Sequence, residues 1–142
     1  NGVQYQLNDA GRYMWVQRAS ITLLVLDGNS IANDNSMRAA AVTQNTINQG
    51  TTLGTTATAT ESGFHAIVRT SSASYYRAVA WPNTTTISVA SSAVTSANQW
   101  VGNSGGTFSI NGTNFRIYAL GSSVSTGDLP DLRRIFNKLA NL

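Results

Sequence analysis

Short segments in which apolar and polar residues alternate recur along most of the chain, as β-strands with one buried face require. The clearest lie at residues 20–26, 37–43, 64–69, 75–81 and 84–90, with further candidates at 3–7, at 13–16 and around Trp100 and Phe115. Clusters of turn-forming residues separate them, and we interpret Asp27-Gly28-Asn29 as one such turn. The Thr-rich residues 51–60 predict an irregular edge strand. Eight or nine strands at this spacing predict an antiparallel β-sandwich or barrel.

The pattern changes to a helical one at the end of the chain. Apolar residues recur at i, i+3, i+7 and i+10, at Leu129, Leu132, Phe136 and Leu139. Asp128 precedes them as a candidate N-cap, Pro130 stands where a missing N–H costs little, and Asp131 places negative charge near the positive end of the helix dipole. The sequence therefore predicts a short α-helix at about 129–140 that packs against the strands.

Composition favours one compact domain over residues 1–142, because 42% of the 142 residues are hydrophobic. Only 11% are charged, against about 25% in an average soluble domain, and Ser, Thr, Asn and Gln supply the polarity. Such a surface is typical of virion or extracellular proteins. The absence of cysteine excludes disulfides and thiolate chemistry, and no apolar run approaches the roughly 20 residues of a membrane span.

The net charge of +3 does not by itself indicate a nucleic-acid-binding surface. Most cations are isolated along the chain: Arg12, Arg18, Arg38, Arg69, Arg77 and Arg116. Only Arg133, Arg134 and Lys138 cluster, and a solvated helix face accounts for them. Phosphate binding needs several cations on one surface, so we expect no nucleic acid as a partner. The lack of a long apolar run predicts no insertion into a membrane.

Three segments resemble the concanavalin A-like lectin and glucanase superfamily in its laminin-G-like form. They are Ser20-Ile-Thr-Leu-Leu-Val-Leu26, the stretch from Asn98-Gln-Trp-Val-Gly102 to Asn114-Phe-Arg-Ile-Tyr118, and Ser122 to Leu132. The resemblance implies an all-β jelly-roll sandwich with a short C-terminal helix. The low charge looks most like the members found on phage tail fibres, which implies host attachment through a cell-surface glycan and a homo-oligomer, commonly a trimer.

Catalysis is not expected from these residues. Glycoside hydrolysis normally needs two carboxyl groups about 5–9.5 Å apart, whereas the six acidic residues are spread through predicted turns and the helix cap. The Glu-x-Asp-x-x-Glu strand of the superfamily's glucanases is absent. The Ser30 turn has only His65 as a candidate base, in a predicted strand without the spacing that an esterase requires.

A weak Ca²⁺ candidate remains at Asp27, Asn29 and Asp34, whose oxygens suit a hard cation, although their spacing fits no EF-hand. A polar turn explains the same residues, so we predict no bound cofactor.

The candidate glycan contacts lie near one predicted turn. Sugars offer apolar C–H faces and a rim of hydroxyls, so their sites combine an exposed aromatic ring with amide and guanidinium groups. Trp81 beside Pro82 suits the platform, with Asn83, Tyr75, Tyr76 and Arg77 near it. Adjacent tyrosines on a strand face opposite sides, so we expect one in the core and one exposed.

These observations favour a non-catalytic carbohydrate-recognition module. The alternatives are a structural decoration, capping or oligomerisation domain of a phage particle or fibre and, with least support, a polysaccharide-degrading enzyme.

Overall fold

The computed structural model describes residues 6–18, 24–29, 36–39, 45–48, 62–78, 82, 84–92, 99–101, 103–104, 107–108 and 114–142. Within them the fold is antiparallel β-structure followed by one C-terminal helix. The strands are β1 (Ala10–Arg18), β2 (Leu24–Asn29), β3 (Ser36–Ala39), β4 (Asn45–Thr46), β5 (Gly63–Arg69), β6 (Tyr75–Ala78), β7 (Thr84–Ile87), β8 (Gln99–Val101), β9 (Asn103–Ser104), β10 (Thr107–Phe108) and β11 (Asn114–Gly121). The helix α1 spans Leu129–Ala140, which confirms the predicted bounds.

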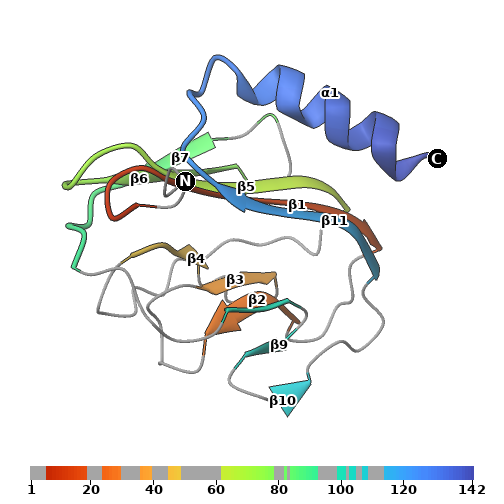
Figure 1. Ribbon diagram of the computed structural model, residues 1–142, viewed down its shortest axis with the longest axis horizontal. Helices are drawn as coiled ribbons and strands as arrows, with labels where there is room; N and C mark the ends of the chain where they lie inside the picture. Colours follow the sequence, from red (N-terminus) through yellow and green to blue (C-terminus); the bar gives the residue numbers. More distant parts are fainter. Residues whose placement is uncertain are drawn as a thin grey trace.

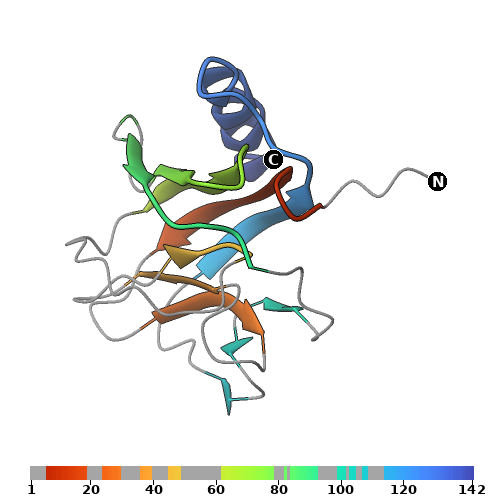
Figure 2. The same ribbon diagram turned by 90° about the vertical axis from the view of Figure 1, so that its left-hand side faces the viewer.

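A five-stranded sheet in the order β11-β1-β5-β6-β7 organises the molecule. Every neighbouring pair in it is antiparallel. The helix lies across one face of this sheet, and the smaller β4-β3-β2-β8 sheet lies on the other side (Figure 1). Viewed along the perpendicular direction, β11 and β7 mark the two edges of the large sheet (Figure 2). We call the helix-covered face the outer face and the opposite face the inner face.

The outer face is an apolar core built by alternate residues of the central strands. Its buried members are Tyr13, Phe64, Ala66, Val68, Tyr76, Ala78, Leu129 and Phe136. The helix docks on it through an edge-to-face contact between the Phe64 and Phe136 rings, whose centroids are 5.3 Å apart. Such pairs add about 0.5–1.5 kcal/mol to the burial of the rings themselves, so this contact anchors the helix.

The buried face of α1 differs from the predicted one in the last turn of the helix. Leu129, Phe136 and Ala140 are buried, whereas Leu139 is 50% exposed. Ala140 lies eleven residues, close to three full turns, after Leu129, so it faces the sheet more directly than Leu139 does. The prediction that Leu139 belongs to the buried face is therefore wrong.

The segment between β11 and α1 is tied to the sheet by buried phenols. The Tyr13 hydroxyl donates to the Ser122 carbonyl at 3.0 Å, and the Tyr76 hydroxyl donates to the Val124 carbonyl. A side chain at Gly11 would collide with the Tyr13 phenol, which explains the glycine there. These bonds set where the helix starts.

Asp128 occupies the predicted N-cap position but makes no side-chain capping bond to the helix. Its carboxylate instead accepts a hydrogen bond from the Ser125 hydroxyl at 2.6 Å, so it stabilises the turn that leads into the helix.

The interpretation of Asp27-Gly28-Asn29 as a turn is wrong. These residues belong to β2 and pair with β8. The β2–β3 register shifts between Val25 and Asp27, so Leu26 is an extra residue in the ladder, as in a β-bulge. Pairing with β8, which is distant in the sequence, therefore overrides the turn propensity of Asp27, Gly28 and Asn29.

Candidate functional site

The β6–β7 hairpin carries every residue at which the sequence predicts ligand contact. Tyr75, Tyr76 and Arg77 lie on β6, and the described residues resume at Pro82 and β7. Trp81 and Asn83 lie outside the described residues, so their roles stay predictions.

Strand β6 is buried on both faces. Tyr75 is 1% exposed, Tyr76 7% and Arg77 8%. The two tyrosines do face opposite sides, since Tyr75 packs in the inner cluster and Tyr76 in the outer one. The expectation that one of them is exposed is wrong, because β6 lies between β5 and β7 with packed side chains on either face. Neither ring is a platform for a ligand, and both instead support the hairpin.

Strand β7 is the exposed part of this site. Thr84, Thr85 and Thr86 are all exposed, in register with Ala78, Arg77 and Tyr76 of the buried neighbour. Each hydroxyl both donates and accepts hydrogen bonds. Thr84 and Thr86 lie on the outer side with Ala78 and Tyr76, and Thr85 lies on the inner side with Arg77, so hydroxyl groups stand on both faces of this edge of the sheet.

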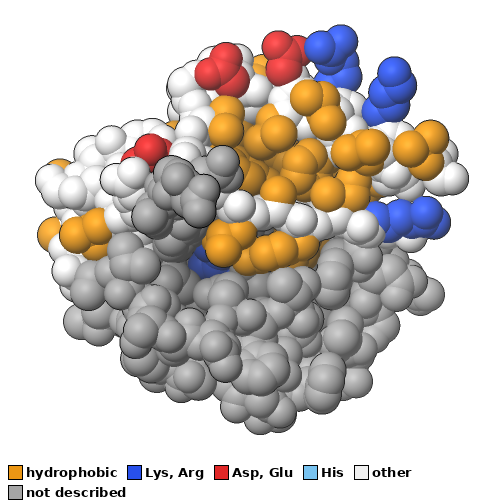
Figure 3. All heavy atoms as spheres, viewed as in Figure 1, with side chains coloured by type: hydrophobic (Ala, Val, Ile, Leu, Met, Phe, Trp, Pro, Cys, Tyr) orange, Lys and Arg blue, Asp and Glu red, His pale blue; other side chains and the backbone are white. Residues whose placement is uncertain are grey.

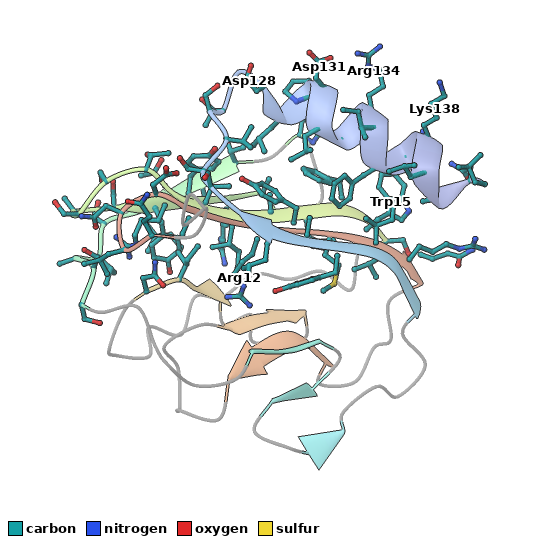
Figure 4. The ribbon with its side chains drawn as sticks, in the orientation of Figure 1. Arg12, Trp15, Asp128, Asp131, Arg134 and Lys138 are labelled. Atoms are coloured by element: carbon teal, nitrogen blue, oxygen red, sulfur yellow. The ribbon has the colours of Figure 1, made fainter. Side chains whose placement is uncertain are left out.

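Three arginines from three different strands share the inner face. Arg12 and Arg77 both pair in register with Ile67, which lies in the inner core. Arg69 is two residues further along β5 and so faces the same side. Arg12 and Arg69 are 0% exposed. In Figure 4 Arg12 points away from the helix toward the smaller sheet, whereas Trp15 points to the helix. We call Arg12, Arg69 and Arg77 the inner arginine cluster.

Arg69 donates hydrogen bonds to four backbone carbonyls in three segments of the chain. Its Nε donates to the Ile47 carbonyl at 2.9 Å, and its Nη1 donates to the carbonyls of Val89 at 3.0 Å, Ser71 at 3.2 Å and Ser74 at 3.4 Å. The guanidinium also lies 5.1 Å from the centre of the Tyr75 ring, within cation–π range. These contacts make Arg69 a structural residue that joins the β5–β6 turn to neighbouring segments.

Burial is the largest influence on the pKa values of Tyr75 and Arg77. It raises the pKa of Tyr75 to about 12, although Arg69 and Arg77 pull in the opposite direction. Burial also lowers the pKa of Arg77, with Tyr75 opposing the shift. His65 is 1% exposed on the same face, in register with Met14. Alternation in residues 10–16 and 63–69 indicates which of their side chains share a face of each strand. The sequence does not show that these two strands are neighbours, so it does not predict that their charged residues lie together.

The described carboxylates are engaged around the start of the helix. Asp9 accepts from the Ser123 backbone N–H at 2.6 Å, and hydrogen bonds from Ser123 hold the pKa of Asp9 below its usual value. Asp131 forms an exposed ion pair with Arg134 at 3.1 Å. Among the described side chains, no group of three or more His, Asp or Glu residues is arranged to hold a metal ion.

The side chains of the weak Ca²⁺ candidate lie outside the described part of the structure. Asp27 and Asn29 are placed only as backbone in β2, and Asp34 lies outside the described residues.

No family model, no curated protein and no solved structure matches this chain. Among the described residues, no helix has the length and apolar character needed to cross a membrane.

Proposed function

We propose that this chain is a non-catalytic carbohydrate-recognition and attachment module on a virion or extracellular surface, and that its two larger sheets form a jelly-roll sandwich of the concanavalin A-like type. The observation that carries the proposal is the contrast between buried β6 and the exposed threonines of β7. Strand β7 is paired with β6 and carries its exposed hydroxyls on both faces. In the sequence it directly follows residues 79–83, which include Trp81 and Asn83.

Carbohydrate binding suits this edge chemically. Hydroxyl and amide groups match the donor and acceptor rim of a sugar, and an indole matches its apolar face. Threonine has a short branched side chain, so little rotamer freedom is lost when it contacts a ligand. In this proposal Trp81, Asn83 and the β7 threonines contact the glycan, and Tyr75, Tyr76 and Arg77 hold the hairpin from beneath.

A glycan array probed with the soluble domain tests the proposal. We expect binding to one class of polysaccharide, lost in Trp81→Ala and kept in Thr126→Val, a change at an exposed threonine before the helix and outside the proposed site. An array that stays blank for the domain, both as prepared and when clustered on a multivalent carrier, contradicts recognition.

The second candidate function is structural, as a decoration, capping or oligomerisation domain of a particle. It is favoured by a separate observation, the half-exposed apolar residues Leu120, Ile135 and Leu139. Attachment that survives Trp81→Ala, together with self-association in light scattering, supports this alternative.

A polysaccharide-degrading activity has the least support. A reducing-sugar assay that stays flat across pH and added Ca²⁺ is the expected result.

A further inference from the structure

The helix α1 carries a second apolar stripe beside the residues that dock it on the sheet. Leu132, Ile135 and Leu139 recur at i, i+3 and i+7, the spacing at which two paired helices contact each other. Leu132 is half-buried against the outer core, whereas Ile135 and Leu139 are each 50% exposed. Ile135 directly precedes the buried Phe136 and is therefore turned about 100° away from it around the helix. We call Leu132, Ile135 and Leu139 the α1 seam.

Opposite charges accompany the α1 seam along its length. Asp131 and Lys138 directly precede the seam residues Leu132 and Leu139, and both charged residues are exposed. In Figure 4 Asp131 and Lys138 both project from the side of α1 that points away from the sheet. Figure 3 shows acidic side chains over the start of the helix, basic ones toward its end and hydrophobic ones beneath them. The helix thus has an acidic start and a basic end beside one exposed apolar stripe.

We propose that a second copy of this chain covers the α1 seam, with the two α1 helices packed side by side and antiparallel about a two-fold axis. A two-fold contact uses the same surface of both copies, so that surface must be complementary to itself. The α1 seam meets this condition, because an antiparallel partner lays its basic end beside the acidic start of the first helix. Burial of the seam residues then supplies the attraction, and the charges select the orientation.

The positions of the charges define the register of the two helices. When Leu132 is level with the partner's Ile135, the two Ile135 side chains meet near the two-fold axis. Asp131 and the partner's Lys138 are then offset by two residues, about 3 Å along the helix axis. Asp131 already accepts a hydrogen bond from Arg134 of its own helix at 3.1 Å, and a carboxylate has room to accept from a second donor.

A parallel pair of helices does not bring these charges together. In a parallel two-fold pair, the side of α1 that bears Asp131 and Lys138 lies next to the opposite side of the partner's helix. That opposite side carries Leu129 and Phe136, which pack into the outer core. Charged side chains at such flanking positions set the orientation of paired helices, so those of α1 favour the antiparallel arrangement.

The dimer does not depend on carbohydrate recognition, which we place at β7 and at Trp81 and Asn83. Glycan binding is tested by substitutions at Trp81 and Thr85, and the dimer is tested by substitutions on α1. Either proposal can therefore fail while the other holds.

Light scattering after size-exclusion separation, over a dilution series, tests the proposal. We expect a dimer that dissociates on dilution. Ile135→Lys should shift the protein to monomer because it places two cations near the two-fold axis. Asn137→Lys, the matched control, should leave the dimer intact, because Asn137 lies about 200° around the helix from Ile135. Circular dichroism should show both variants folded, since both positions are exposed.

Charge reversal tests the antiparallel arrangement. Asp131→Lys alone and Lys138→Asp alone should each weaken the dimer roughly tenfold, because each turns two weakly attractive exposed pairs into repulsive ones. An equimolar mixture of the two variants should form a heterodimer at least as tight as the parent dimer, since both of its charge pairs are attractive again. Sedimentation equilibrium measures the three dissociation constants.

Four results overturn the proposal. They are a monomer at every concentration, a trimer, a dimer that Ile135→Lys leaves unchanged, and a mixture of the two charge variants that associates no better than either variant alone.

Discussion

The two faces of the five-stranded sheet are both buried, but they differ in chemistry. The outer face packs aromatic and aliphatic side chains against α1. The inner face has an apolar cluster that includes Met14, Ile67 and Tyr75, yet it also buries the inner arginine cluster and His65. The outer face is held by burial of apolar area, and the inner face depends in addition on satisfied charged hydrogen bonds. Burying a cation costs much free energy unless protein groups form hydrogen bonds with it in place of water.

Removing the Arg69 guanidinium should lower the stability of the folded state most. The substitution removes hydrogen bonds on the inner face and leaves the contacts of the outer face unchanged. Arg69→Met keeps a long apolar side chain but removes the hydrogen-bond donor of four backbone carbonyls. Each bond to a charged group contributes about 1.5–3 kcal/mol, so we expect the midpoint of denaturant unfolding to fall further than for any other change considered.

The matched control is Arg116→Met, which loses one exposed hydrogen bond to Gln17. It should shift the midpoint little. Equal effects of the two substitutions would refute the structural role of Arg69.

Removing the aromatic contact on the outer face should lower the free energy of unfolding slightly less than the loss of the Arg69 guanidinium does. Phe136→Ala removes the ring that packs on Phe64 and should cost about 3–5 kcal/mol in the free energy of unfolding, the usual loss for a buried aromatic ring. Ile135→Ala, one residue earlier on the half-exposed side, should cost much less. Urea titration of both variants at a concentration where each is monomeric measures the difference, and similar losses would mean that the helix is not anchored by Phe136.

High pH should weaken both faces together. Burial raises the pKa of Tyr75 on the inner face and of Tyr76 on the outer face, each to about 12, from an ordinary 10.0, and raises that of Tyr13 as well. The folded state thus favours the neutral phenols, so their contribution to stability is complete below pH 10 and is lost as the pH rises toward 12.

The expected observation is that phenolate absorbance from these residues appears together with the loss of circular dichroism. Ionisation of all five tyrosines near pH 10 in a protein that stays folded would contradict the burial of these rings.

The sequence predicted the features that depend on neighbouring residues. Asp128, Pro130 and the spacing of Leu129 and Phe136 located α1, and alternation located β5 because Phe64 to Arg69 switch faces at every residue.

Features that depend on strand order could not be predicted in the same way. Adjacent β1 and β5 are separated by 44 residues, between Arg18 and Gly63, so Arg12 and Arg77 appear isolated in the sequence although they share one face. The burial of both Tyr75 and Tyr76 has the same origin, since it follows from the central position of β6 and not from β6 itself.

Our central proposal is glycan recognition by the exposed hydroxyls of the β7 edge. Titration calorimetry with the strongest ligand from the glycan array tests it directly, using Thr85→Val, which exchanges a hydroxyl for a methyl group at nearly constant shape, beside Thr126→Val. The account predicts weaker binding for Thr85→Val and unchanged binding for Thr126→Val. Equal affinity of the two variants and the parent protein would contradict it.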